Sequence, residues 1–354
     1  MTEHSRSHIW PGVPMALASA ALFGAAVPFS KILLGSIDPQ LVAGLLYLGA
    51  GVGLCLVHMG RRAIGLPAVE APLRRSDLPW LAAVVVLGGV LGPLLLMIGL
   101  NKIDAASGSL LLNLESIATM MIAWLVFKEN VDRRLFLGAA AIVLGVIILS
   151  YEGQSLSLNI GAVFIAGACL SWGVDNNLTR KLSASDPVLI AMAKGLAAGM
   201  VNLGIGFARG GDVPSVGLTA FAALAGFLGI GVSLVLFVLA LRHLGAARTG
   251  AYYSLAPFIG ALISILFLGE SLTLKLVIAA ILMAIGLWLH LTERHEHDHG
   301  HGDLEHEHAH IHDSHHQHAH VGPITEPHSH PHSHKALRHS HAHYPDLHHR
   351  HGHS

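Results

Sequence analysis

Residues 242–270 read RHLGAARTGAYYSLAPFIGALISILFLGE, and residues 101–129, which lie 141 positions earlier, read NKIDAASGSLLLNLESIATMMIAWLVFKE. Each stretch begins with a polar turn and a pair of alanines, continues through small and apolar residues, and ends on a glutamate. From Thr249 onward the second stretch has about 20 residues without a charge, which is long enough for a helix to cross a bilayer. The two copies predict an internal repeat built from membrane-spanning helices.

The composition of the chain also indicates a membrane protein. Of its 354 residues, 53% are hydrophobic and only 12% are charged, whereas a soluble domain has about 25% charged residues. The two cysteines, Cys55 and Cys169, both lie in apolar runs. They are therefore expected to be small buried side chains, and no disulfide framework is predicted.

Ten apolar runs are candidates for membrane-spanning helices. They lie at about 12–34, 39–57, 78–99, 105–127, 133–150, 160–181, 187–207, 217–240, 246–268 and 274–291. The pair Phe23-Gly24 recurs as Trp172-Gly173, 149 positions later, which assigns five spans to each half. An odd number of spans turns the second half over relative to the first. Inverted repeats of this kind are typical of secondary transporters, which bind substrate near the midplane between the halves.

The distribution of lysine and arginine predicts the orientation. With the N-terminus in the cytoplasm, sixteen of the 21 cations lie on the inner side and four on the outer side, and Lys194 lies within a span. We therefore expect a multi-pass protein of the inner membrane with both termini cytoplasmic. The expected organisation is a cytoplasmic N-terminus at 1–11, a first five-helix repeat at 12–150, a second at 160–291 and a tail at 292–354.

Several short features recur between the halves or mark helix positions, namely the two aromatic-glycine pairs, Ala105-Ala106 and Ala246-Ala247, Pro257, and the helix-ending Glu129 and Glu270. Together they resemble the EamA family of the drug/metabolite transporter (DMT) superfamily, over residues 12–291. The resemblance implies ten helices and an exporter-like carrier of small metabolites such as amino acids, nucleobases, drugs or metallophores. An N-terminal capping role for the following helix would account for Glu129 and Glu270 without transport.

This sequence departs from the family pattern at one position. The family often has proline in the middle of both copies of the quoted stretch, but the first copy has Glu115-Ser116 where the second has Ala256-Pro257. We therefore expect Pro257 to break the helix of the second copy near the midplane, and the helix of the first copy to be less broken.

Glu115 is the first candidate for a substrate or coupling residue. It lies about ten residues into its span, and an ionisable side chain at the bilayer centre costs about 2.5–3.5 kcal/mol. It would bind a cationic group of the substrate or carry the coupling proton. The structural alternative is a protonated glutamate that hydrogen-bonds across helices. Asn113, two residues away, lies on a different face of the helix.

Asp175 and Lys194 lie at matched depths in two consecutive, antiparallel spans, so we expect them to form a pair. The pair would stabilise the structure or gate the substrate. Alternatively, the two side chains would each snorkel to the cytoplasmic interface without meeting. Asp175, Asn176 and Asn177 place three polar side chains in one helical turn, and this turn should face the protein interior. Tyr252 and Tyr253 would contact the substrate or anchor their helix at the interface. The remaining candidates beside Asp175 are Trp172, Asn176 and Asn177.

The tail differs from the rest of the chain, because 23 of the 28 histidines follow residue 294. Its low apolar content predicts disorder in the absence of a ligand. Histidines mixed with acidic residues predict binding of Zn²⁺, Ni²⁺, Co²⁺ or Cu²⁺. The candidate ligands are His295, His297, His299, His301, His306, His308, His310, His312, His315, His316, His318 and His320.

The leading hypothesis is a secondary-active, proton-coupled exporter of a small polar metabolite such as an amino acid, a nucleobase or a drug. The alternative is transport of, or tolerance to, a divalent metal or a metal-chelating metabolite, with the tail as a metal buffer or sensor. The expected partners are the bilayer, a small-molecule substrate and divalent metal ions, and a homodimer is left open. No constellation predicts an enzyme, a required cofactor or nucleic-acid binding.

Overall fold

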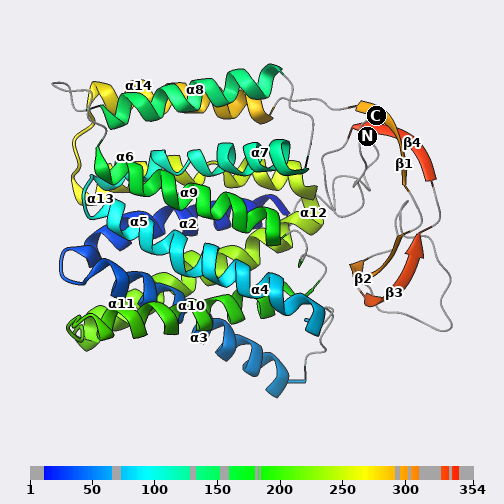
Figure 1. Cartoon of the computed structure of the whole chain (residues 1–354), viewed down its shortest axis with the longest axis horizontal. Coiled ribbons are helices and arrows are strands. Elements are labelled where there is room, and N and C mark those ends of the chain that lie inside the picture. The colour runs from blue at the N-terminus through cyan, green and yellow to red at the C-terminus, as the bar shows by residue number, and fades with distance from the viewer. Residues whose placement is uncertain are drawn as a thin grey trace.

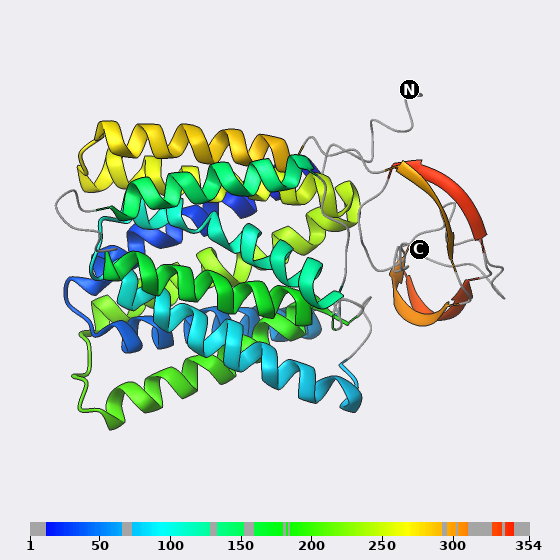
Figure 2. The same cartoon turned by 45° about the horizontal axis from the view of Figure 1, so that its top comes forward.

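A bundle of helices packed side by side forms the body of the computed structural model (Figure 1). The turned view shows α8 (Arg133–Ser150) and α14 (Leu274–Leu291) packed together along one edge of this bundle (Figure 2). The structure describes residues 12–65, 73–127, 133–151, 159–179, 182, 185–291, 296–301, 304–310, 328–334 and 337–342.

Two series of helices follow one another along the chain. The first comprises α2 (Gly12–Leu34), α3 (Pro39–Ala63), the short 3₁₀ helix η1 (Arg75–Asp77), α4 (Leu78–Val84), the π-helix η2 (Val85–Leu91), α5 (Gly92–Leu100), α6 (Ala105–Leu111), α7 (Leu114–Phe127) and α8 (Arg133–Ser150). The second comprises α9 (Ile160–Thr179), α10 (Pro187–Ala208), α11 (Val216–Gly226), the π-helix η3 (Phe227–Val232), α12 (Ser233–Tyr253), α13 (Ala256–Leu268) and α14 (Leu274–Leu291).

The two series correspond at several of their elements. A shift of 149 residues carries the starts of α2 and α3 to within one residue of the starts of α9 and α10. A shift of 141 residues does the same for η2 and η3 and for α8 and α14. The correspondence extends to the π-helices, which are rare elements. The internal repeat is therefore present in the fold as well as in the sequence.

Length and hydropathy identify the membrane segments. Among the described residues, seven helical segments are long and apolar enough to cross a membrane, at Gly12–Leu34, Pro39–Ala63, Arg75–Leu100, Ala105–Val126, Arg133–Ser150, Pro187–Ala208 and Val216–Ala240. Two shorter apolar helices cover Ala256–Leu268 and Leu274–Leu289. The helix α9 has 20 residues but lies outside this set, because the polar turn at 175–177 lowers its hydropathy.

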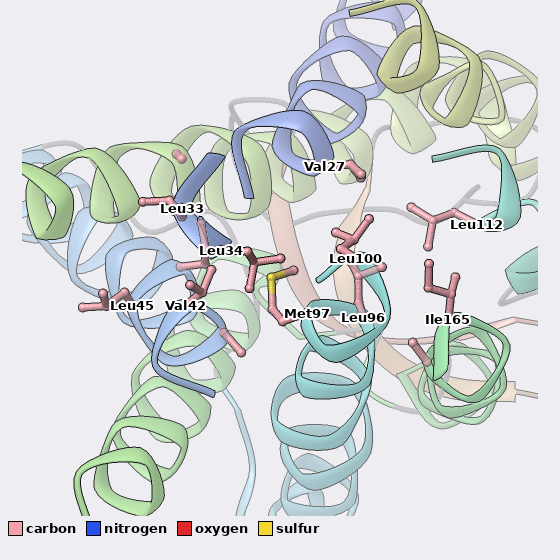
Figure 3. Close-up of a cluster of buried hydrophobic side chains, with 14 of the residues drawn as sticks. Val27, Leu33, Leu34, Val42, Leu45, Leu96, Met97, Leu100, Leu112 and Ile165 are labelled. Carbon is pink, nitrogen blue, oxygen red and sulfur yellow. The ribbon is translucent and has the colours of Figure 1, made fainter. Parts of the chain in front are cut away.

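Close packing of small and apolar residues holds the bundle together. A buried cluster joins α2, α3, α5 and α9, and includes Leu33, Val42, Leu100 and Ile165 (Figure 3). Glycines let the backbones of α3 and α10 approach closely, since a Cβ on Gly195 would lie 2.6 Å from the nearest backbone nitrogen of α3. Large apolar side chains on the outside, among them Phe267 and Trp288, provide a surface suited to lipid.

The predicted difference between the two copies of the quoted stretch is wrong. In the second copy the helix is interrupted between Tyr253 and Ala256, and Pro257 lies in the first turn of α13. In the first copy the helix is also interrupted, between Leu111 and Leu114, at the equivalent place. Both copies therefore consist of two helical pieces.

Polar side chains take the place of proline at the first break. The Asn113 amide donates a hydrogen bond to the carbonyl of Leu110, at 2.8 Å, and the Ser116 hydroxyl donates one to the carbonyl of Asn113, also at 2.8 Å. These bonds satisfy carbonyl groups that an interrupted helix leaves without their usual partners. A broken helix at membrane depth is tolerated where such groups are satisfied within the protein.

Two further expectations differ from the structure. The expected loop at about 241–245 lies inside the single helical element α12. The tail, expected to be disordered, contains β1 (Glu296–His301) paired antiparallel with β4 (Leu337–Ala342), and β2 (Leu304–His310) paired with β3 (His328–His334). The alternation of histidine with other residues has the two-residue period of a strand, which suits this conformation.

Candidate functional site

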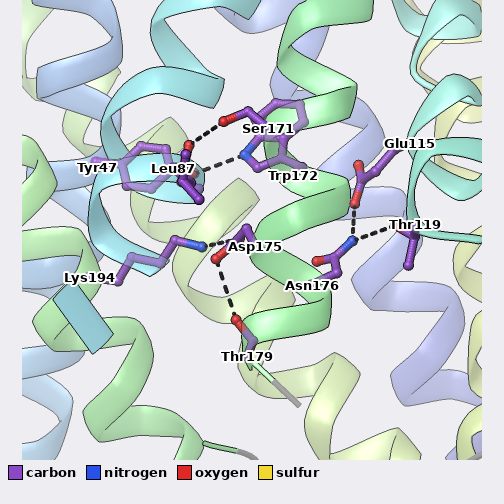
Figure 4. A network of polar contacts seen from close by, with 11 residues as sticks. Tyr47, Leu87, Glu115, Thr119, Ser171, Trp172, Asp175, Asn176, Thr179 and Lys194 are labelled. Carbon is purple, nitrogen blue, oxygen red and sulfur yellow. Dashed lines mark hydrogen bonds and ion pairs between the residues drawn. The ribbon is translucent and has the colours of Figure 1, made fainter. Parts of the chain in front are cut away.

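A network of polar side chains lies where α7, α9, α10 and η2 meet (Figure 4). Two of these elements belong to the first half of the chain and two to the second. Sites between the halves of an inverted repeat are where secondary transporters bind substrate. The network includes five of the residues that the sequence singles out: Glu115, Trp172, Asp175, Asn176 and Lys194.

Asp175 and Lys194 form a direct ion pair. The Lys194 ammonium lies 2.5 Å from the Asp175 carboxylate, and the two side chains are 14% and 5% exposed, respectively. The hydroxyl of Thr179, one turn further along α9, is 3.4 Å from the other carboxylate oxygen. The predicted contact is therefore confirmed, and the alternative of two separate snorkelling side chains is wrong.

Glu115 lies on the opposite side of α9 from Lys194. Its carboxylate accepts a hydrogen bond of 2.9 Å from the amide of Asn176, which also lies 3.3 Å from the hydroxyl of Thr119 (Figure 4). The consecutive residues Asp175 and Asn176 thus join α9 to two different helices, α10 and α7. The hydrogen bond across helices agrees with the structural alternative for Glu115, and the side chain keeps a partly accessible surface.

The other two asparagines have structural contacts. The Asn177 amide donates to the carbonyls of Gly173, at 2.8 Å, and Thr119, at 3.2 Å, and so joins α9 to α7. Its side-chain oxygen is buried and has no hydrogen-bond partner among the residues that the structure describes. Asn113 does not reach Asp175 or Lys194, because its amide serves the helix break and lies 3.8 Å from the Met283 sulfur.

The π-helix η2 presents three consecutive carbonyl groups to side chains of other helices. The Gly88 carbonyl accepts hydrogen bonds of 3.0 Å from both the Tyr47 hydroxyl and the Trp172 indole nitrogen. The Leu87 carbonyl accepts one of 2.8 Å from Ser171, and the Asn202 amide lies 3.4 Å from the Gly89 carbonyl. A π-helix disturbs the usual helical pairing and is frequent at functional sites.

The sequence interpretation did not select Tyr47, Ser171 or Asn202. Each has a backbone carbonyl as a partner, which no side-chain pattern reveals. The available signals were the Gly88-Gly89 pair within a span and Asn202, whose side chain is fully buried.

The two adjacent tyrosines have different surroundings. Tyr252 packs against a small cluster that contains Ala16 and Ala240. The phenol of Tyr253 lies within electrostatic range of Glu115. Contact of either tyrosine with the substrate stays a prediction. Pro257 helps to form the break that follows these tyrosines.

Glu270 caps a helix of the other half rather than the helix that follows it. Its two carboxylate oxygens accept hydrogen bonds of 2.7 Å from the backbone amides of Ala105 and Ala106, at the start of α6. At the same end, the Lys31 ammonium donates to the carbonyls of Leu100, at 2.5 Å, and Ile103, at 2.6 Å. The proposed cap for α14 is thus wrong for Glu270, and Glu129 lies outside the described residues.

The histidines of the tail fall into two groups. The register places His306, His308 and His310 of β2 opposite histidines of β3, while β1 carries His297, His299 and His301. The other six candidates lie outside the described residues: His295, His312, His315, His316, His318 and His320. Within the described part of the chain, no group of three or more histidine, cysteine or carboxylate side chains is placed to hold a metal ion.

Curated relatives and one solved structure are similar to this chain. An uncharacterized transporter of Methanothermobacter thermautotrophicus is 28% identical over 77% of this chain and 84% of its own length. The uncharacterized transporter YyaM of Bacillus subtilis is 20% identical over 77% of this chain and 90% of its own length. A crystal structure with 15% identity aligns over 79% of this chain and 96% of its own, with a TM-score of 0.58, and so shares the fold.

The family model of the EamA-like transporter family matches the chain twice, at residues 10–151 and 159–292. The matches cover both series of helices. They agree with the internal repeat and with the apolar spans. The protein is therefore a multi-pass membrane transporter and not an enzyme, and the chain belongs to the EamA-like transporter family.

Proposed function

We propose that the protein is a secondary-active, proton-coupled exporter of a small polar metabolite in the inner membrane. In this proposal ten helices span the bilayer as two inverted five-helix repeats, with both termini in the cytoplasm. The observation that carries the proposal is the set of Glu115, Asp175 and Lys194 inside the bundle, at the junction of the halves. Ionisable residues in such positions mark substrate and ion pathways in membrane proteins.

Each part of the network has a proposed role. Glu115 is the proton-binding group, because its hydrogen-bond donor is a neutral amide and the residue keeps a partly accessible surface. The pair of Asp175 and Lys194 joins α9 to α10 and would open or shift when the halves move. Asn176 positions the Glu115 carboxylate, and Trp172 fixes η2 through the Gly88 carbonyl.

A transport assay in proteoliposomes tests this function. Vesicles that contain the full chain are screened with labelled amino acids, nucleobases and cationic drugs, with and without an imposed pH gradient. We expect uptake of one class to depend on the gradient, and Glu115→Gln to abolish that dependence. Asp212→Asn, which changes an exposed carboxylate in the loop before α11, is the matched control and should behave as wild type. Gradient-driven transport that persists in Glu115→Gln would exclude Glu115 as the proton carrier.

The histidine-rich tail supports a second proposal, that it binds divalent metal and acts as a buffer or sensor beside the transporter. The alternating histidines of β2 and β3 favour this, since neutral imidazole is a ligand for Zn²⁺, Ni²⁺, Co²⁺ and Cu²⁺. Passage of a bare divalent metal through the bundle is less well supported, because the described helices contain no cluster of metal-ligating side chains.

A further inference from the structure

The charged groups of the central network do not balance one another. Asp175 and Lys194 form a close pair that is largely shielded from solvent, so their charges cancel. Glu115 has no salt bridge to any residue in the described ranges, and its hydrogen-bond donor is the neutral Asn176 amide. The network therefore contains one negative charge in excess when Glu115 is ionised.

The groups that face Glu115 do not remove this imbalance. Asp175 and Lys194 act on it through space from α9 and α10, and the neutral groups within electrostatic range are the Cys169 thiol of α9 and the phenols of Tyr47 and Tyr253. An ionised carboxylate without a cationic partner in such surroundings is costly. Glu115 must therefore hold either a proton or the positive charge of a ligand.

The surroundings of Glu115 suit a ligand with an apolar group beside its charge. Glu115 and Asn176 keep partly accessible surfaces although they lie between helices in the interior of the bundle (Figure 4). The Tyr253 ring packs against Phe23 and Phe237, with centroid distances of 5.5 and 4.7 Å. Aromatic rings near a carboxylate favour organic cations, since a cation is also attracted to the face of a ring.

The same geometry disfavours other classes of substrate. Lys194 is the one ammonium group of the network, and its 2.5 Å contact with Asp175 leaves no free positive charge for the carboxylate of a zwitterion or an anion. A divalent metal needs several converging ligands, and the described residues provide no cluster of three.

We propose that the transporter recognises a monovalent organic amine, and that its ammonium group and a proton compete for the Glu115 carboxylate. This proposal rests on the transport function proposed above and names the substrate class of the same site. Since each ligand cation replaces one proton, binding releases protons at a pH where the free site is protonated, and affinity for the amine rises as the pH rises.

Three compounds with one carbon frame test the proposal by calorimetry on the full chain in nanodiscs. The probes are 2-phenylethylamine, a cation; phenylalanine, a zwitterion; and 3-phenylpropionate, an anion. We expect the amine to bind at least about tenfold more tightly than the other two, because their carboxylate is repelled by Glu115. Below the pH at which Glu115 ionises, amine affinity should increase about tenfold per pH unit, with release of about one proton per amine bound.

Variants separate charge recognition from folding. Glu115→Gln should lose amine binding, Glu115→Asp should retain part of it, and Asp212→Asn should bind as wild type; thermal unfolding of each shows that it is folded. Preferential binding of the zwitterion or the anion, or binding without proton release, would overturn the proposal. The transport assay is separate: amine binding without transport would refute the transport function alone, whereas gradient-driven transport of a zwitterion would refute the amine proposal alone.

Discussion

Gly88 shows how strongly the site depends on a single residue. A Cβ at this position would collide with the Asp175 carboxylate and the Lys194 ammonium. The absence of a side chain lets η2 lie directly against the ion pair. The Gly88 carbonyl accepts hydrogen bonds from Tyr47 and Trp172, so this residue joins η2 to α3 and α9 beside the charged pair.

Replacement of Gly88 by alanine should therefore abolish transport. The added methyl group displaces one member of the pair, or moves η2 away from it, and both changes separate groups that now touch. Gly204→Ala, on the lipid-accessible side of α10, is the control, because no atom lies within 4 Å of its Cβ position. Transport and thermal unfolding of both variants check this. Wild-type activity in Gly88→Ala would show that the contact is dispensable.

The ion pair of Asp175 and Lys194 should be strongly coupled. Removing one member of a buried pair leaves an uncompensated charge and typically costs about 3–5 kcal/mol. We therefore expect Asp175→Asn and Lys194→Met each to destabilise the protein substantially, and the double variant to cost much less than the sum. Denaturant unfolding in detergent for all four proteins measures the coupling energy. Additive losses would mean that the two side chains do not stabilise one another.

At the scale of elements, the two broken helices form a matched pair. In the first copy the helix is divided into α6 and α7, and in the second copy into α12 and α13. The α6 and α13 pieces cross where a Cβ on Gly260 would lie 2.7 Å from the Ser109 hydroxyl. This hydroxyl is buried and has no hydrogen-bond partner within the described ranges. A short helix piece has few internal hydrogen bonds, so its ends depend on caps supplied by other elements.

Glu270 is such a cap, and its loss should loosen α6. Glu270→Ala removes two hydrogen bonds to the first amides of this helix, and the loss of a side-chain cap costs about 0.5–2 kcal/mol. We expect the contact between α6 and α13 to open more often. A cysteine at Ser109, in a background without Cys55 and Cys169, should then react faster with a membrane-impermeant thiol reagent.

Asp212→Ala in the same background is the control for this experiment. Asp212 is an exposed carboxylate that lies in a different loop, so its removal should leave the labelling rate unchanged. Equal labelling rates in the Glu270→Ala protein and the control would show that Glu270 does not hold α6 closed.

At the scale of the whole molecule, a symmetric scaffold carries an asymmetric site. The repeat aligns Asp175 with Ala26, Lys194 with Leu45 and Glu115 with Ala256, so each charged residue has an apolar counterpart in the other half. The two halves have equivalent helices, but each of these charges occurs in only one half. If the halves exchange conformations during transport, the substrate therefore meets different side chains when the site opens to either face of the membrane.

The tail should be separable from the transporter body. In a chain that ends at residue 291, transport of the metabolite should persist, because α7, α9, α10 and η2 provide the central network. Binding of Zn²⁺ or Ni²⁺, measured by calorimetry at neutral pH on the full and shortened chains, should be lost with the tail. Undiminished metal binding by the shortened chain would assign the metal site to the helical body instead.

The sequence by itself determined the repeat, the apolar helices and the pairing of Asp175 with Lys194, because periodicity and depth along a helix follow from the order of residues. It did not reveal the break beside Asn113, the helix that Glu270 caps, or the partners of Tyr47 and Asn202. These features depend on hydrogen bonds between side chains and backbone groups far apart in the chain. Only the tertiary structure decides which carbonyl or amide lies within reach of a given side chain.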